Sequence, residues 1–305
     1  MLLSLLVVTV VVGTFSSPVF ALGTDAKSPE ARILPHGVEV SGSVITYNLP
    51  PVSNKSIWAH ERLTAAVHNK TLSDPALVMN GITYLPLRAV ANALGISASY
   101  NSASRTMTVS GGGLYLTATD GGFVTYANDR PLFSFSPNVI MSNGRMYVPA
   151  SALAKALGMS FTVAGERVTL DGSLRPLSPA SDFYRDDEVF WLARIITAEA
   201  GGESLLGQIA VGDVILNRVR SESFPNTIYG VIFDRKWGIQ FSPAANGTIY
   251  NTPSYTAILA ARICLEGTSL SDNAMYFLNP AISTSSWIVN NRPYTYTIGN
   301  HYFFL

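Results

Sequence analysis

An internal repeat is the feature of this 305-residue chain that most restricts its fold. The segment GITYLPLRAVANALGI, residues 81–96, recurs as GRMYVPASALAKALGM, residues 144–159, with glycine, tyrosine, proline and leucine at the same spacing. In each copy a short strand leads to a proline, which suits the first turn of a helix because it fixes φ and lacks an N–H. The helix that follows ends at Gly95 or Gly158, as a left-handed C-cap favours. Two such units, each followed by a hairpin-like segment, predict one α+β domain over residues 30–172.

The repeated residues set backbone geometry and offer no chemistry of their own. No acid, histidine or cysteine recurs with them, so the favoured interpretation is a scaffold or binding module. The pattern that includes Pro86, Arg88 and Gly95 resembles the bacterial stalk module named after the N-terminal domain of copper amine oxidases. The resemblance implies neither copper nor oxidase activity here. Because the repeat offers a scaffold without catalytic side chains, we expect the module to attach the chain to a wall polymer or to a protein partner.

Residues 1–21 are predicted to be a secretory signal. The apolar run at residues 2–12 is shorter than the roughly 20 apolar residues that a membrane span needs. The small residues that end at Ala21 suit a signal-peptidase site. No lysine or arginine precedes the run, so an uncleaved signal that stays as a membrane anchor is the alternative. The sequence therefore predicts a secreted protein.

Composition disfavours several classes of function. Twenty basic and twenty acidic residues give a formal net charge of +0, which disfavours nucleic acid as a partner. Cys264 is the single cysteine, so no intrachain disulfide can form, and its apolar helical surroundings predict a buried structural thiol. The four histidines lack the spacing of zinc ligands. We therefore expect no metal and no cofactor.

The second half of the chain changes character after a segment at 173–184 that is rich in serine and proline, which predicts a linker. Over residues 185–305, apolar residues recur at helical spacing, beginning with 188–200. The next helix, 204–221, is apolar almost all round, which places it in the middle of a domain. The end of the chain is rich in tyrosine and phenylalanine and predicts strands or an irregular hairpin. We expect an α+β protein of two domains, the second mostly helical with a small β element.

Two glutamates flank the Gly201–Gly202 pair that separates the first two of these helices. Glu199 falls in the last turn of its helix, where the carbonyl groups disfavour a carboxylate. That field, together with burial, would raise the pKa of Glu199 and keep it protonated, the state that can donate a proton to a glycosidic oxygen. The alternative for Glu199 is a solvated glutamate at a helix end. Glu203 begins the next helix, where an acid is favoured, so it is interpreted either as a first-turn stabiliser or as a substrate-binding residue.

The second half resembles the SleB/CwlJ cell wall hydrolases, a family that includes the spore cortex-lytic enzymes. The resemblance rests on AEAGGESLLGQIAVGDVILNRVRSESFPNTIYGVIF at 198–233, on QFSPAANGTIYNTPS at 240–254, and on the later runs YFLNP and TIGNHYFF. It implies a lysozyme-like fold, and it gives the catalytic role to Glu199, the first acid of the family motif E-A-x-G-E. Some spore members have arginine where this chain has Gly201, which leaves the subfamily and the sugar contacts open.

The same resemblance implies lytic transglycosylation of peptidoglycan, which cleaves the MurNAc–GlcNAc bond of glycan strands in the cell wall or the spore cortex. One acid/base suffices, because the 6-hydroxyl of the sugar itself attacks. A hydrolytic muramidase is one alternative; it would need a second carboxyl roughly 5 to 9 Å away, and the candidates are Asp213, Asp234 and Asp272. A non-catalytic wall-binding or spore structural protein is another. An amidase or peptidase would want a metal cluster or a Cys/His pair, which the sequence does not offer.

The predicted substrate-binding residues, besides Glu203, are Gln240, Phe241, Tyr276 and Asn279. Aromatic faces and amides hold sugar rings and N-acetyl groups, and these four lie in the family-like motifs, outside the obvious helical core. Phe241 and Tyr276 can equally be core residues. His301, in the aromatic segment at the end of the chain, is interpreted as a structural histidine.

Overall fold

The computed structural model describes strands at 33–34, 38–41 and 44–47, and residues 61–134, 139–236, 238–271, 273–283 and 286–305. The predicted signal at 1–21 and the candidate acid Asp272 lie outside these residues. The first three strands, β1 (Ile33–Leu34), β2 (Val38–Ser41) and β3 (Val44–Tyr47), form an antiparallel sheet. Among the helices that the structure describes, none has both the length and the apolar character that crossing a bilayer requires.

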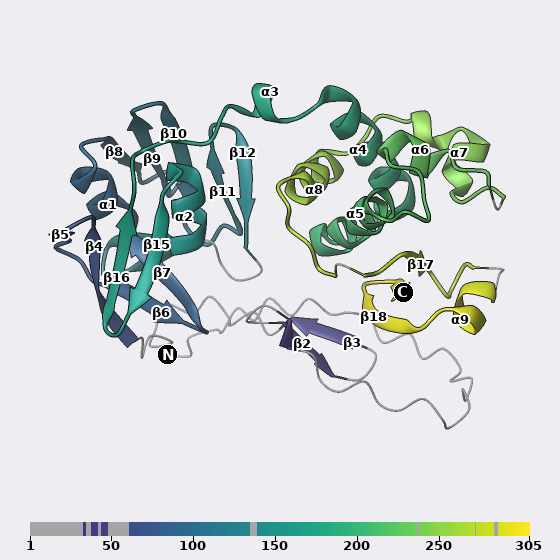
Figure 1. Ribbon diagram of the computed structural model, residues 1–305, viewed down its shortest axis with the longest axis horizontal. Coiled ribbons are helices and arrows are strands. Elements are labelled where there is room, and N and C mark those ends of the chain that lie inside the picture. Colours follow the sequence, from purple (N-terminus) through teal and green to yellow (C-terminus); the bar gives the residue numbers. More distant parts are fainter. Residues whose placement is uncertain are drawn as a thin grey trace, which may run out of the picture. The chain divides into compact units, whose positions relative to one another are not determined.

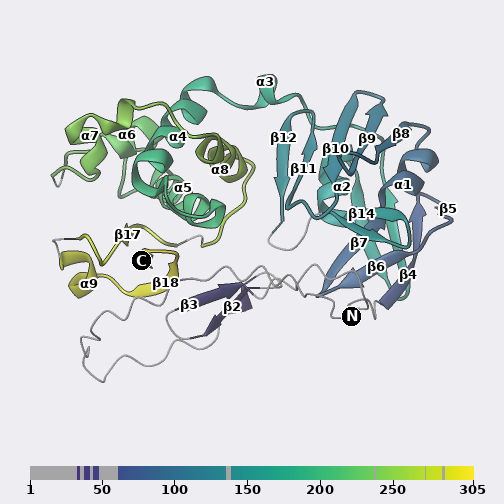
Figure 2. The same cartoon turned by 180° about the vertical axis from the view of Figure 1, so that it is seen from behind.

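The sequence repeat forms two copies of a strand–helix–hairpin unit (Figures 1 and 2). The first copy consists of β7 (Ile82–Pro86), α1 (Leu87–Ala93), β8 (Ser97–Asn101) and β9 (Thr106–Gly111). The second consists of β14 (Arg145–Pro149), α2 (Ala150–Leu157), β15 (Ser160–Ala164) and β16 (Arg167–Asp171). Both prolines, Pro86 and Pro149, take the N-cap position, just before the predicted first turn. Gly158 caps α2 in the left-handed conformation with φ 62°, as predicted.

The two copies meet through β7 and β14, which pair antiparallel with Tyr84 opposite Pro149 and Pro86 opposite Tyr147. Equivalent residues of the repeat thus exchange places, so a local twofold axis relates the strands. The larger sheet has the order β13-β14-β7-β6-β4-β16-β15, with β5 beside β4, and the second sheet has the order β12-β11-β10-β9-β8. The remaining strands are β4 (Glu61–Val67), β5 (Lys70–Thr71), β6 (Ala76–Met79), β10 (Leu114–Thr119), β11 (Val124–Ala127), β12 (Arg130–Phe133) and β13 (Ile140–Ser142).

The repeat helices hold the sheets together because their apolar faces are buried between them. Leu87 and Val90 of α1 and Leu153 and Leu157 of α2 are at most 2% exposed. They share one core with strand residues such as Leu116. Burial of a leucine or valine side chain stabilises a fold by about 1.5–3 kcal/mol, so the alanine- and leucine-rich repeat is explained by packing.

The first residues of the predicted linker, 173–184, still contact the repeat module, which was predicted over residues 30–172. The backbone N–H of Arg175 donates to Leu157 O at 2.9 Å, and that of Leu177 donates to Ala156 O at 3.2 Å. The segment then forms the short helix α3 (Ala180–Phe183). These bonds fasten residues 175–177 to the end of α2. Independent folding of the two predicted domains stays a prediction.

The C-terminal part, from residue 186 on, is mostly helical. Its long helices are α4 (Asp186–Ala200), α5 (Leu205–Arg220) and α8 (Tyr255–Leu265), which pack against one another (Figure 1). Its short helices are α6 (Ile228–Ile232), α7 (Ser242–Asn246), the 3₁₀ turn η1 (Thr248–Tyr250) and α9 (Trp287–Asn291). A sheet of order β17-β19-β18 completes it, from β17 (Tyr276–Leu278), β18 (Tyr294–Ile298) and β19 (His301–Phe304). The prediction of a mostly helical domain with a small β element is confirmed.

Helix α5 lies in the centre of this core, as its apolar pattern predicts. Ile209, Val211, Val214 and Ile215 have no exposed surface, although they point in different directions around the helix. Gly212 allows this packing, because a Cβ there would lie 2.7 Å from Cys264 Sγ. Cys264 is buried, which confirms the prediction of a structural thiol.

Candidate active site

Glu199 lies in the last turn of α4, where the sequence places it. Its side chain is half-buried, and burial raises the pKa of Glu199 to about 7, against a smaller lowering by Arg218. The end of α4 is held in place by Thr197, whose hydroxyl donates to Ala193 O at 2.9 Å and accepts from the backbone N–H of Ser254 at 3.1 Å. Glu199 is therefore a carboxyl group that exchanges its proton near neutral pH, on a helix end that is fixed from two sides.

Arg218 is a buried cation that the sequence analysis did not single out. It comes from α5 and is 5% exposed. Its Nε donates to Met275 O at 2.7 Å, and its Nη1 is buried without a hydrogen-bond partner among the described residues. Burial lowers the pKa of Arg218 to about 10, while the charges of Tyr276, Asp234 and Glu199 oppose that shift. The only signal in the sequence that could have identified Arg218 is its position as an arginine within an apolar helix, in the LNRV run at 216–219.

Aromatic rings surround the Arg218 guanidinium. Its Cζ lies 4.9 Å from the ring centre of Phe224 and 5.2 Å from those of Phe241 and Tyr276. Such contacts stabilise a desolvated cation through the negative face of the ring. They keep Arg218 charged within range of Glu199.

Tyr276 begins β17 and lies between two arginines. Its hydroxyl accepts a hydrogen bond from Arg292 Nη2 at 2.8 Å, and Arg292 Cζ lies 4.5 Å from the ring centre. Trp287 of α9 lies next to it, with ring centres 6.3 Å apart, and is 52% exposed. Of the predicted substrate-binding residues, Tyr276 and Phe241 both contact Arg218, and Tyr276 also lies beside the exposed ring of Trp287.

Glu203 lies on the other side of the Gly201–Gly202 pair, before α5, and its carboxylate is occupied. The side chain is 8% exposed, and His301 Nδ1 lies 3.6 Å from Glu203 Oε1. Asn300 donates to the same carboxylate from its backbone N–H and from Nδ2, at 3.2 and 2.9 Å. Burial lowers the pKa of His301, against the opposing charge of Glu203. These contacts give Glu203 and His301 a structural role between α5 and the β18–β19 turn; substrate binding by Glu203 stays a prediction.

The other three predicted substrate-binding residues differ in exposure. Phe241 is 4% exposed and belongs to the core of the helical domain. Its ring therefore packs in the core, which is the alternative that the sequence left open. Gln240 is half-buried, with Nε2 3.4 Å from Gly238 O. Asn279 is also half-buried, and its Oδ1 accepts from Ala281 N at 3.0 Å, which shapes the loop after β17. Only Gln240 and Asn279 of the three leave polar atoms near the surface.

The candidate second acids are placed differently. Asp213 is 1% exposed and accepts from Leu270 N at 2.5 Å, a structural bond inside the domain. Asp234 is half-buried, accepts from Lys236 N at 2.9 Å and contributes to the field on Arg218. It also lines a small pocket with residues of α6, of α7 and of the segment between them, namely Ile232, Phe233, Arg235, Ile239, Ala244 and Ala245. Among the described residues no three acids, histidines or cysteines are grouped as a metal site would require.

Known proteins resemble each half of the chain. The cell wall hydrolase family model matches residues 202–304, and the model of the copper amine oxidase N-terminal domain matches residues 66–171. A spore cortex-lytic enzyme of Bacillus cereus is 43% identical over 120 residues, which is 39% of this chain and 45% of the relative. The cell wall hydrolase CwlJ of Oceanobacillus iheyensis is 31% identical over 103 residues, which is 32% of this chain and 72% of that protein.

A solved structure matches as well. The catalytic domain of the germination-specific lytic transglycosylase SleB from Bacillus anthracis is 41% identical, with 42% of this chain and 100% of that domain covered and a TM-score of 0.37. The chain spans about half the length of the spore cortex-lytic enzymes that it matches, 45% for the Bacillus cereus relative. Because its C-terminal part shares 31% identity with CwlJ over 72% of that protein and matches the family model, this chain belongs to the cell wall hydrolase family.

Proposed function

We propose that the C-terminal domain cleaves peptidoglycan glycan strands by lytic transglycosylation, with Glu199 as its one acid/base. The observation that carries this proposal is the half-buried carboxyl of Glu199, whose pKa of about 7 lets it both give and take a proton at neutral pH. Relatives named spore cortex-lytic enzyme and the SleB lytic transglycosylase domain support the same reaction.

The reaction follows from one proton that leaves Glu199 and returns. Protonated Glu199 donates to the oxygen of the MurNAc–GlcNAc bond, so the bond from C1 of MurNAc to that oxygen breaks and GlcNAc leaves as an alcohol. The C1 that remains has oxocarbenium character, and the 6-hydroxyl of the same MurNAc attacks it. The hydroxyl proton passes to the Glu199 carboxylate, which restores the acid and leaves a 1,6-anhydro end.

Arg218 supports the ionised half of this cycle. Once Glu199 has given up its proton, a carboxylate forms in a half-buried position, where desolvation penalises it. The positive charge of Arg218, buried among aromatic rings, lowers that penalty. Arg218 is thus a positioning and tuning residue, and Glu199 is the group that meets the glycosidic oxygen.

The glycan would be held by polar and aromatic groups near this carboxyl. Tyr276, Gln240 and Asn279 are the proposed contacts, and the exposed ring of Trp287 beside Tyr276 offers a face for a sugar. The carboxylate of Glu203 is already satisfied by Asn300, so a sugar contact from it would compete with that bond.

A hydrolytic muramidase is the second candidate, and Asp234 is the observation in its favour. It is half-buried and shares the electrostatic surroundings of Arg218 with Glu199. Muropeptide mass spectrometry after digestion of sacculi separates the reactions. Anhydro-muramic ends support transglycosylation, reducing muramic ends support hydrolysis, and free stem peptides or no product contradict both.

The family supports a proposal about the substrate and the place of action. We propose export and action on the spore cortex or the cell wall, with the N-terminal module attached to wall polymer or to a protein partner. Digestion of cortex, which contains muramic lactam, in parallel with vegetative sacculi tests which polymer is preferred. A pull-down of an inactive Glu199 variant of the chain with intact peptidoglycan tests attachment without cleavage.

A further inference from the structure

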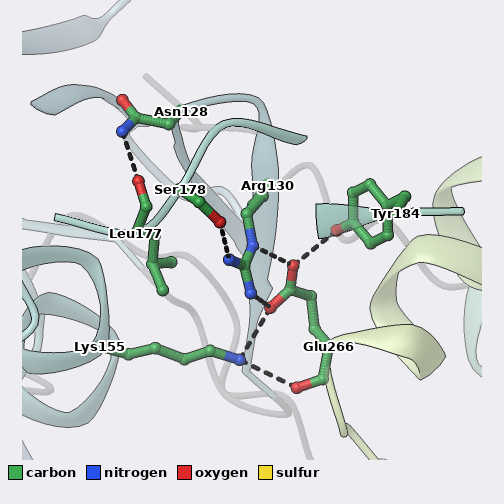
Figure 3. Close-up of polar contacts among 7 residues, drawn as sticks. All are labelled: Asn128, Arg130, Lys155, Leu177, Ser178, Tyr184 and Glu266. Atoms are coloured by element: carbon green, nitrogen blue, oxygen red, sulfur yellow. Dashed lines mark hydrogen bonds and ion pairs between the residues drawn. The ribbon is translucent and has the colours of Figure 1, made fainter. Parts of the chain in front are cut away.

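Glu266 is the residue that follows α8, and its buried carboxylate binds three side chains that donate hydrogen bonds. Its side chain is 2% exposed. Arg130 binds it with two parallel bonds, Nε to Oε1 at 2.8 Å and Nη2 to Oε2 at 3.0 Å. Lys155 Nζ lies 2.9 Å from Oε2, and the Tyr184 hydroxyl donates to Oε1 at 2.6 Å (Figure 3). A carboxylate with bidentate arginine, lysine and phenol partners is fully satisfied.

The partners come from different parts of the chain. Arg130 belongs to β12 and Lys155 to α2, both in the repeat module, whereas Glu266 caps the C-terminus of α8 in the hydrolase domain, residues 185–305. Tyr184 lies in the connecting segment, just after α3. Lys155 Nζ donates also to the backbone oxygen of Glu266 at 2.9 Å. The Glu266 carboxylate of the hydrolase domain therefore binds two cations of the module, Arg130 and Lys155.

Solvent is excluded from the centre of this contact. The Arg130 side chain is 5% exposed, and its Cζ lies 3.4 Å from the ring centre of Phe183. Nη1 of Arg130 lies 3.4 Å from Ser178 Oγ. Surface ion pairs contribute little because water screens them, whereas a desolvated bidentate pair depends strongly on both partners.

Apolar contacts extend the same surface. Val124 of β11 and Phe133 of β12 pack against the core of the hydrolase domain. Burial and the neighbouring Tyr255 of α8 raise the pKa of Tyr126 to about 12. Arg130 and Tyr126 of the β11–β12 hairpin thus contact the two ends of α8, and apolar side chains of the same hairpin contact the hydrolase core.

We propose that Glu266 anchors the repeat module to the hydrolase domain, so that this face of α8 is a docking surface whose partner is the module of the same chain. The inference concerns assembly of the chain and does not rest on the proposed reaction. It differs from the expectation of two domains joined only by a linker, in which the module would be free to bind a wall polymer through any of its surfaces.

The contact at Glu266 is connected through α8 to α4, the helix that carries Glu199. The two ends of α8 are both tied: Glu266 at one end binds Arg130, and Ser254 at the other end donates to the Thr197 hydroxyl at 3.1 Å. Thr197 precedes Glu199 by half a turn of α4. The module therefore braces a helix that fixes the end of α4.

The test cuts the connection and asks whether the two parts stay together. A recognition sequence for a site-specific protease is inserted between Ser181 and Asp182, which are both exposed, in the full chain. After cleavage the two pieces should elute together in size-exclusion chromatography, and dilution gives their dissociation constant. Arg130→Met should weaken this association on the order of 100-fold, because Glu266 would then be buried without its bidentate partner.

Matched variants distinguish docking from a loss of folding. Asp187→Asn removes an exposed ion pair with Arg185, in which the side chains are 70% and 59% exposed, and should leave the association unchanged. Arg130→Lys keeps the charge and should weaken the association less than Arg130→Met, which keeps the test valid if the methionine variant misfolds. The double variant Arg130→Met/Glu266→Leu should associate more tightly than Arg130→Met alone, because no buried carboxylate is left without its arginine and Lys155, whose side chain is 41% exposed, can be solvated by water.

Three outcomes overturn the proposal. The cleaved pieces of the unsubstituted chain could elute separately. Arg130→Met could associate as tightly as the unsubstituted chain. The double variant could associate no more tightly than Arg130→Met alone, which would show that the unpaired Glu266 carboxylate is not what weakens the association. Each result is read without any measurement of glycan cleavage, so a failure of docking and a failure of the proposed reaction are distinguishable.

Discussion

Glu203 and Asn300 are 97 residues apart in sequence, and Asn300 donates to the Glu203 carboxylate from both its backbone N–H and its side chain. The contact joins the start of α5 to the turn between β18 and β19. Gly299 makes it possible, because it has φ 57° and a Cβ there would lie 1.9 Å from Glu203 Oε2.

Gly299→Ala should therefore destabilise the domain through both backbone strain and displacement of Glu203. A left-handed conformation costs a non-glycine residue on the order of 1–2 kcal/mol, and loss of the buried carboxylate contact adds to that. Gly247→Ala is the control, since Gly247 has φ 83° but nothing within 4 Å of its Cβ position. Urea unfolding should show a larger loss for Gly299→Ala; equal losses would mean that Glu203 can move without cost.

Glu199→Gln should abolish glycan cleavage while the chain stays folded. Glutamine keeps the shape of the side chain but cannot donate the proton, and loss of a general acid costs on the order of 10² to 10⁴ in rate. Glu222→Gln, at an exposed position after α5, is the matched control and should keep full activity. Release of muropeptides from sacculi measures both, and near-normal turnover by Glu199→Gln would remove Glu199 from the mechanism.

Cleavage should decline as the pH rises through about 7, because the proton-donating form of Glu199 is lost above its pKa. Arg218 lowers that pKa, so Arg218→Met should move the alkaline limb of kcat/KM to higher pH. Arg220→Met changes an exposed arginine on the same helix and should leave the limb in place. An unmoved limb in Arg218→Met would show that Arg218 does not tune the acid.

Glu199→Gln should also raise thermal stability near neutral pH. The pKa of Glu199 is raised from 4.5 to about 7 by burial, so the folded chain binds a proton there more tightly than the unfolded chain does. The stability from this group is complete below pH 4.5 and is lost as the pH rises through 7. The melting temperature of the variant relative to the parent should therefore increase between these pH values; a constant difference would contradict the raised pKa.

Tyr276→Phe should raise KM for glycan more than it lowers kcat. The substitution removes only the hydroxyl that accepts from Arg292, so Arg292 and the neighbouring Trp287 lose their alignment while Glu199 keeps its position. Tyr229→Phe changes an exposed tyrosine on α6 and serves as the control. A fall in kcat at constant KM would instead place Tyr276 in the chemical step.

The repeat and the helical half could be read from sequence because local signals agree there. Pro86 and Pro149 start helices, Gly158 ends one in the left-handed conformation, and the pattern of α5 matches its burial on all sides. The helix-end position of Glu199 followed from the same kind of signal, since α4 ends at Ala200 and Gly201 caps it.

The sequence alone did not show which neighbours each candidate side chain contacts. Phe241 and Tyr276 looked alike as aromatic candidates, but Phe241 is 4% exposed in the core while the Tyr276 hydroxyl accepts from Arg292. The place of Asp213 in an apolar helix favoured a structural hydrogen bond over a role as second acid, but only the structure identified its partner, Leu270 N. Exposure and hydrogen bonding depend on the neighbours from other elements, which no local pattern specifies.

The amino-acid sequence by itself determined the repeat, the helices and the helix end that carries Glu199, because these depend on residues a few positions apart. Only the tertiary structure decided that Arg218 lies close enough to shift the pKa of Glu199 and that Arg130 and Glu266, 136 residues apart, share one buried ion pair. Charges act through space and strengthen as water is excluded, so their effect is set where distant segments meet.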